Sequence, residues 1–304
     1  MQIISRRKFI TVSAGTVGLA GLSVTGKWLS DNKYSLFCEA IVDKVKLGNS
    51  GLTVSRIAMG TGTAGYDHVS NQTLLGIEKF VELSRHAYER GITFYDMADI
   101  YGSMPYIGEA IKSLPREKLT LLSKIRTYED GSERNKPVQQ ILDRFRKETR
   151  TDYFDIMLMH CMEERNWINS RKHYMEGLAK AKQDGIVKAV GVSCHHVDAL
   201  NEAAESSWVD VIMARINPFG TLMDAPVDVV KLILLKAIQK GKGVIGMKIF
   251  GDGQNASAKE REKSIQFVIN EQLAHCMTMG FESKAQLNDA VGRVMHRVSM
   301  NNKR

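Results

Sequence analysis

From residue 44 onward, short apolar runs alternate with longer stretches in which apolar residues recur every three or four positions. The first two runs, residues 44–47 and 52–55, flank Gly48-Asn49-Ser50-Gly51 and predict a β-hairpin, because glycine and asparagine suit tight turns. Further runs typical of strands occupy residues 56–60, 93–96, 119–124, 154–160, 189–193, 209–214, 243–248 and 276–280.

The stretches between these runs are amphipathic and predict helices. The first covers residues 74–89 and ends near Gly91, a residue type common just after a helix. Others are expected at residues 137–149, 167–183, 197–205, 228–239 and 284–298. Eight strands that alternate with helices are typical of a (β/α)8 TIM barrel of about 250 residues. We therefore predict an α/β fold, with an N-terminal β-hairpin and one barrel domain over residues 41–304.

Polar side chains stand where several of these strands end. Asp96, Lys124 and His160 each close an apolar run, and Tyr101 follows Asp96 by five residues. In a parallel barrel the C-terminal strand ends meet on one face, where active sites are built. These four side chains are therefore expected to share one pocket.

The four residue types suit proton-coupled hydride transfer to a carbonyl group. A phenol titrates near pH 10, and a nearby ammonium group such as that of Lys124 would lower the pKa of Tyr101. Asp96 would keep Lys124 charged, and His160 would donate a hydrogen bond to the carbonyl oxygen. Tyr101 would then act as general acid in reduction and general base in oxidation.

These residues also carry a resemblance to the aldo-keto reductase family. The Asp-x-x-x-x-Tyr-Gly segment of the family stands here at residues 96–102, and Lys124 and His160 match its lysine and histidine. The segment of residues 47–55 is similar to the hairpin that closes the bottom of the family's barrel, and Gly191-Val192-Ser193 is similar to a cofactor-contacting segment. The resemblance extends over residues 44–298.

This resemblance implies a nicotinamide cofactor, NADP by family habit, with NAD possible. The chain departs from the family at Cys194, where asparagine is common, and at Met213 and Ile216, where glutamine and tyrosine are common. Lys284 or Arg293 would pair with the 2′-phosphate of NADP. The implied cofactor-binding residues are Ser193, Cys194, Asn217, Lys248, Gly280, Ser283 and Gln286.

Charge and cysteine content narrow the possible functions. The net charge is +8, from 42 basic and 34 acidic residues; residues 1–40 contribute +3 (five basic, two acidic), which leaves a mild +5. We therefore expect no nucleic-acid partner. The four cysteines form no CxxC pair, and neighbours in the run Cys194-His195-His196 would point to opposite sides of an extended chain. With His160-Cys161 added, this run still predicts loop histidines and no metal.

The N-terminal segment predicts export. Arg6 and Arg7 precede an uncharged, weakly apolar stretch at residues 11–24, which resembles a twin-arginine signal. Residues 1–40 are therefore expected to be a signal peptide and leader that engage the twin-arginine export machinery, without a stable membrane anchor. The protein would fold in the cytoplasm and be exported to the periplasm, with a cofactor held tightly enough to travel with it.

Two functions stay open at this point. The first is an NAD(P)-dependent oxidoreductase that reduces an aldehyde or ketone to an alcohol, or runs the reverse reaction. The second is an exported cofactor-binding or sensory protein with little turnover, motivated by the departures at Cys194 and Met213. Substrate contacts are expected from residues 161–167 and 250–259, and a long C-terminal substrate loop is not expected, which predicts an open pocket. A metal-dependent hydrolase is disfavoured, because the strand ends supply no cluster of carboxylates.

Overall fold

The computed structural model describes residues 40–127 and 136–302. The expected signal peptide therefore lies outside the described residues, apart from Ala40 at its end. Among the residues that are described, no helix combines the length and the apolar character that crossing a membrane requires.

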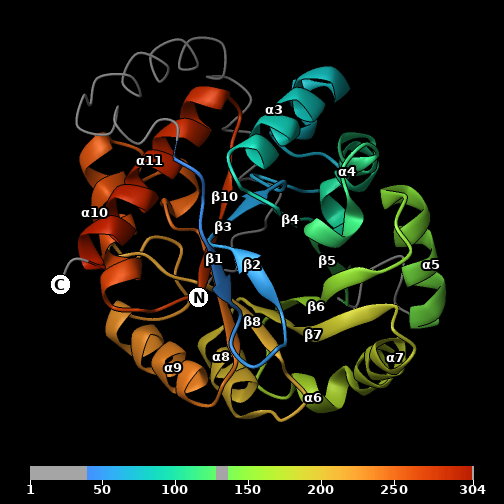
Figure 1. Cartoon of the computed structure of the whole chain (residues 1–304). Helices are drawn as coiled ribbons and strands as arrows, with labels where there is room; N and C mark the ends of the chain where they lie inside the picture. The colour runs from blue at the N-terminus through green and yellow to red at the C-terminus, as the bar shows by residue number, and fades with distance from the viewer. Residues whose placement is uncertain (1–39, 128–135, 303–304) are drawn as a thin grey trace, which may run out of the picture.

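The predicted hairpin is present and closes one end of the barrel. Its strands β1 (Lys44–Lys46) and β2 (Thr53–Ser55) pair antiparallel. Figure 1 looks onto this hairpin, which lies across the barrel. The N–H of Asn49 donates to the Gly241 carbonyl oxygen at 2.8 Å, just before a barrel strand begins, so the hairpin covers the N-terminal strand ends.

The predicted barrel is confirmed as a closed ring of parallel strands, in the order β10-β3-β4-β5-β6-β7-β8-β9. Strand β10 pairs with β3 and completes the ring. The strands are β3 (Ile57–Gly60), β4 (Phe94–Asp96), β5 (Thr120–Arg126), β6 (Phe154–Met162), β7 (Val187–Cys194), β8 (Val211–Arg215), β9 (Gly243–Met247) and β10 (Cys276–Gly280).

Helices surround the strands (Figure 1), and two of the predicted helical stretches are interrupted, while α4 and α10 lie outside the predicted ranges. Gly76, with φ 80°, separates a 3₁₀ turn, η2 (Thr73–Leu75), from α3. The stretch predicted as one helix over residues 167–183 is interrupted at Arg171, which leaves α6 and α7. The helices are α3 (Ile77–Glu89), α4 (Met104–Ile111), α5 (Val138–Thr149), α6 (Trp167–Ser170), α7 (Lys172–Gln183), α8 (Val197–Glu205), α9 (Val227–Gln239), α10 (Ala258–Asn270) and α11 (Lys284–Asn301).

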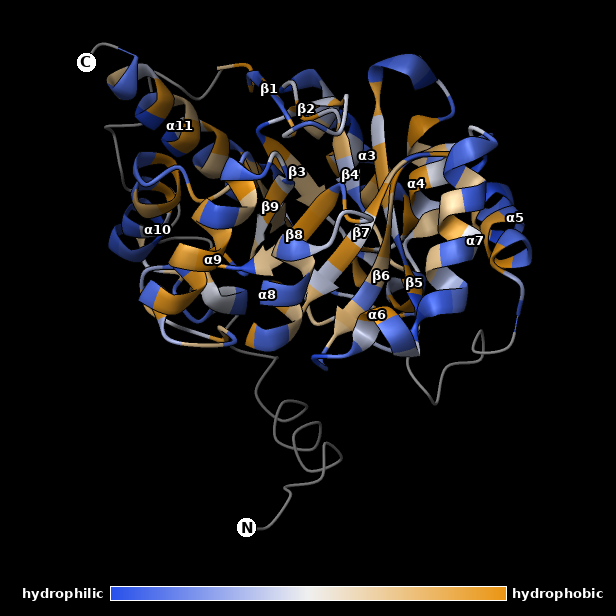
Figure 2. Ribbon diagram, turned by 90° about the horizontal axis from the view of Figure 1, so that it is seen from below, coloured by the Kyte–Doolittle hydropathy of each residue, from blue (hydrophilic) through white to orange (hydrophobic). Residues whose placement is uncertain are grey.

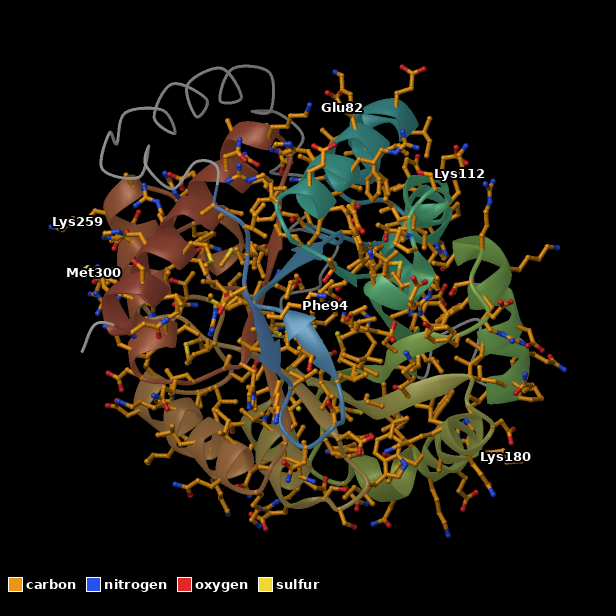
Figure 3. All side chains as sticks on the ribbon, viewed as in Figure 1. Glu82, Phe94, Lys112, Lys180, Lys259 and Met300 are labelled. Carbon is orange, nitrogen blue, oxygen red and sulfur yellow. The ribbon has the colours of Figure 1, made fainter. Side chains whose placement is uncertain are left out.

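Side chains of the strands point alternately into the barrel and toward the helices, because the side-chain period of a strand is two. An inner apolar cluster therefore fills the barrel below the hairpin and includes Phe94, Leu122 and Leu158. A larger cluster lies between strands and helices. Phe94 lies near the centre of the ring in Figure 3, whereas the labelled Lys112 and Lys180 point outward. In Figure 2 the barrel strands are largely hydrophobic, and hydrophilic residues are concentrated on the surrounding helices and loops.

One strand carries an irregularity at its C-terminal end. Between Met159 and Met162, β6 uses three residue steps where its partner β7 uses two, from Val192 to Cys194. Cys161 adopts a φ of 58° within this bulge. Bulges of this kind commonly redirect a side chain beside an active site.

The close contact between hairpin and barrel can be tested at two glycines. Both Gly48 (φ 52°) and Gly51 (φ 78°) need a left-handed backbone, but only at Gly48 would a Cβ meet another backbone, 2.5 Å from the Lys242 carbonyl carbon. We expect Gly48→Ala to lower the free energy of unfolding by at least about 3 kcal/mol, and Gly51→Ala by about 1 kcal/mol. Urea unfolding measures both free energies. Equal losses of stability in the two variants would contradict a close contact between the hairpin and the barrel at Gly48.

Candidate active site

A polar layer lies directly above the inner apolar cluster, at the end of the barrel opposite the hairpin. Asp96, Lys124 and His160 each stand two positions after an inner apolar residue, so they continue the inward-facing alternation of β4, β5 and β6. The same rule places Thr278 and Arg215 in this layer, two positions after Cys276 and Met213. Sequence reasoning missed both, although the alternation was a signal for them.

Asp96 and Lys124 form a buried ion pair. The two residues are 4% and 1% exposed, and Lys124 Nζ donates to Asp96 Oδ1 and, at 2.8 Å, to the Met97 carbonyl oxygen. The Thr278 hydroxyl donates to Asp96 Oδ2 at 2.8 Å. A buried ion pair is tolerated only where its remaining hydrogen-bonding groups also have partners. The bonds to Met97 and Thr278 provide such partners.

Tyr101 stands beside this pair. It ends a 3₁₀ turn, η3 (Asp99–Tyr101), and Lys124 Nζ lies 4.9 Å from the centre of its ring. The ring packs on the loop after β3, where a Cβ at Gly62 or Gly65 would overlap it. Glycine at both positions therefore leaves the space that the ring occupies.

The pKa of Tyr101 differs from the prediction. We expected Lys124 to lower it, but burial raises the pKa well above its usual value of 10.0, and the charges of Asp96, Cys161 and Asp252 raise it further. The physical reason is burial, which disfavours the charged phenolate, and the negative charge of the Asp96 carboxylate adds to this effect. Tyr101 is accordingly a neutral phenol at pH 7, a form that can donate a proton.

His160 completes the group. His160 is 5% exposed, and the centre of its ring lies 5.7 Å from the centre of the Tyr101 ring at an interplanar angle of 87°. Burial lowers the pKa of His160 well below its usual value, and the charge of Lys124 and neighbouring His195 and Arg126 lower it further. A neutral imidazole carries one N–H that can donate to a carbonyl oxygen. The structure thus brings Asp96, Tyr101, Lys124 and His160 together at one mouth of the barrel.

The bulge in β6 builds a second group next to His160. The Cys161 N–H donates to Ser193 Oγ at 2.9 Å, and Cys161 Sγ lies 3.4 Å from His195 Nε2. An Arg215 guanidinium nitrogen contacts His195 Nδ1, and Arg215 pairs with Asp224 at 2.9 Å. Burial, with the charges of Arg215, Lys248 and Lys124, lowers the pKa of His195 to about 3.

Two residues expected to contact the nicotinamide, Cys194 and Asn217, are buried in the protein. Cys194 is fully buried and packs in the cluster between strands and helices, and burial raises the pKa of its thiol. Asn217 is fully buried as well: its amide nitrogen donates to the Thr221 and Lys248 carbonyl oxygens, and its Oδ1 accepts from the Phe219 and Thr221 N–H groups. These bonds use the full capacity of an amide and assign Asn217 to loop structure.

The expected phosphate contacts lie at the start of α11. Ser283 is its N-cap and accepts from the Gln286 N–H at 3.3 Å, and Gly280 ends the preceding strand. Lys248, directly after β9, pairs with Asp252 at 2.8 Å.

The two candidate partners of a 2′-phosphate differ in availability. Arg293 is 1% exposed and is bound to Asp289 and Glu262, so it serves the packing of α11. Lys284 lies at the surface in an ion pair with Glu82 at 2.6 Å. An exposed pair of this kind contributes little to stability, so Lys284 can change partners at small cost.

Comparisons with known proteins agree with one another. The model of the Aldo/keto reductase family matches residues 56–301. The chain is 29% identical over 174 residues to a probable aldo-keto reductase 1 of Glycine max, covering 54% of this chain and 49% of that protein. It is 26% identical over 202 residues to an NADH-specific methylglyoxal reductase of Escherichia coli, covering 60% and 61%. The matches thus span about half to three fifths of these relatives.

Solved structures agree on the fold. A putative aldo-keto reductase from Pseudomonas aeruginosa has a TM-score of 0.70 and 20% identity, and the match covers 85% of this chain and 97% of that one. The holo form of an aldo-keto reductase from Bacillus halodurans has a TM-score of 0.65 and 18% identity, covering 86% and 96%.

The protonation state of Tyr101 can be measured directly. Because burial and Asp96 raise the pKa of Tyr101, we expect titrations of phenolate absorbance for the wild type and Tyr101→Phe to coincide below about pH 10. A phenolate near neutral pH that disappears in Tyr101→Phe would contradict the neutral form.

Proposed function

Because the chain belongs to the aldo/keto reductase family, we propose that it is an NAD(P)-dependent oxidoreductase that reduces an aldehyde or ketone to an alcohol, or runs the reverse reaction. The observation that carries this proposal is the buried Asp96–Lys124 pair beside a neutral Tyr101 and a neutral His160. The similarity to an NADH-specific methylglyoxal reductase supports a small carbonyl compound as substrate.

Each side chain has a definite part in the reduction. When bound, the reduced nicotinamide supplies a hydride to the carbonyl carbon. Tyr101 gives its phenolic proton to the carbonyl oxygen, and the resulting phenolate regains a proton from water. The His160 N–H orients that oxygen. Lys124, held by Asp96, lies close enough to stabilise the transient phenolate by its charge.

The chain's own residues fit the phosphate half of such a cofactor. The N-terminus of α11 carries the partial positive charge that favours phosphate, and Ser283 and Gln286 order its first turn. Lys248 would add a cation once it leaves Asp252. Glycine at position 280 allows Thr63 and Gln72 to pack against the end of β10, because a Cβ there would overlap them.

The residues expected around the nicotinamide depart from the pattern of the family. These departures keep open the second function, a cofactor-binding or sensory protein with little turnover. Ser193 already accepts from the Cys161 N–H, and the Asn217 amide is fully engaged by backbone groups. A protein that binds the cofactor but turns over little would be consistent with these contacts. The complete proton-transfer group favours the enzyme.

Replacing Tyr101 distinguishes the two functions. We expect Tyr101→Phe to lower kcat for carbonyl reduction about 10²–10⁴-fold while cofactor binding, followed by fluorescence, is retained, because only the proton donor is lost. Tyr153→Phe is the matched control, since Tyr153 stacks on Arg116 at the N-terminal end of β6. Wild-type protein that binds the cofactor without turnover would favour the binding function instead.

Cofactor choice depends on Lys284, and a pair of variants tests it. If NADP is used, we expect Lys284→Gln to raise the KM for NADPH about tenfold, a loss of about 1.4 kcal/mol, and to leave the KM for NADH unchanged. Glu82→Gln should act in the opposite direction, because it releases Lys284 from its ion pair. An unchanged NADPH-to-NADH ratio in both variants would exclude Lys284 as the contact to the 2′-phosphate.

A further inference from the structure

Three ligand-type side chains converge at the mouth of the barrel. One ligand atom from each of His160, Cys161 and His195 lies within 4.8 Å of the others. Cys161 Sγ and His195 Nε2 are 3.4 Å apart, close to the roughly 3.5 Å that separates sulfur and nitrogen ligands on tetrahedral zinc. The rings of His160 and His195 stand 6.2 Å apart at 84°, so they approach the thiol from different directions.

The bulge in β6 makes this convergence possible. In a regular strand, His160 and Cys161 would point to opposite faces. The extra residue and the φ of 58° at Cys161 instead bring both to the same mouth, and the bond from the Cys161 N–H to Ser193 Oγ holds this geometry. As expected for neighbours on an extended chain, Cys194 and His195 point in different directions. Cys194 faces the helices, whereas His195 lies beside His160 and Cys161 of the neighbouring strand β6.

The surrounding charges permit a cation. The cations whose charges act on His160 or His195 are Lys124, Arg126, Arg215 and Lys248. Three of them are bound to a carboxylate, which offsets their charges locally; the pairs are Lys124–Asp96, Arg215–Asp224 and Lys248–Asp252.

We propose that His160, Cys161 and His195 bind a zinc ion, which switches the active site off. Two imidazoles and a thiolate suit Zn²⁺, with water in the fourth position. On binding, the Cys161 thiol releases its proton to solvent, and no electron is transferred. His160 then directs a ring nitrogen at the metal and no longer orients a carbonyl oxygen. This inhibitory consequence rests on the proposed function, whereas the binding does not.

Arg215 sets the strength of the site. It donates to His195 Nδ1, so the ring proton of neutral His195 stands on Nε2, the atom that faces Cys161. Coordination through Nε2 requires the proton to move to Nδ1, which displaces Arg215. An acceptor at position 215 would favour the metal-binding tautomer. Arg215→Gln should therefore bind zinc at least threefold more tightly than the wild type, a gain that misfolding would not produce.

The test uses the full chain without cofactor or substrate. Zn²⁺ is titrated against a chromophoric chelator, and Co²⁺ serves as a spectroscopic probe of thiolate ligation. We expect one ion per chain and a thiolate-to-cobalt absorption band. Cys161→Ser should lose the band and at least tenfold in zinc affinity. Cys276→Ala, which changes a buried thiol inside the barrel, and His196→Gln, which changes the next histidine on the loop, should retain both.

Several results would overturn the site. These are a wild type without the cobalt band, equal zinc affinity in Cys161→Ser, loss of binding in Cys276→Ala, or weaker binding in Arg215→Gln. In the activity arm, Zn²⁺ should inhibit carbonyl reduction at the concentration that half-fills the site, and Cys161→Ser should require at least tenfold more. A protein without reductase activity would contradict the proposed function, while the cobalt measurement would still decide the metal site.

Discussion

The buried contact between Lys124 and Asp96 is the interaction on which the mouth of the barrel depends. It joins the ends of β4 and β5, and Thr278 extends it to β10, so three strands share one hydrogen-bonded group. Neither charge would be tolerated there alone, because an unpaired buried ion costs several kcal/mol. Beside this pair, burial is the largest cause that raises the pKa of Tyr101, and the charge of Asp96 raises it further.

The opposite side of the mouth is organised by backbone geometry. The bulge in β6 places His160 and Cys161 on the same side, and Ser193 on β7 holds the bulged N–H. Arg215 on β8 then reaches His195 from the next strand. Ser193, which was expected to contact the cofactor, therefore also supports the bulge beside His160. Function and local structure draw on the same few side chains.

Most of the fold followed from patterns along the chain, because strand and helix periodicity are local properties. The hairpin and all eight strands stand where apolar runs predicted them, and the polar residues above the inner cluster follow from alternation. The break at Arg171 was not predicted, since the helical pattern of residues 167–183 continues through it. Thr278 and Arg215 were missed because their importance comes from partners on other strands.

The sequence by itself determined the barrel, its family and the presence of Asp96, Tyr101, Lys124 and His160 at strand ends or just beyond them. The tertiary structure decided what the environment of each group does. It showed that burial and Asp96 raise the pKa of Tyr101, that the Asn217 amide bonds to backbone groups of its own loop, and that Arg293 is a buried residue of α11. It also brought His195 to Cys161. The reason is physical: pKa values and hydrogen-bond capacity depend on neighbours distant in the chain, which periodicity does not specify.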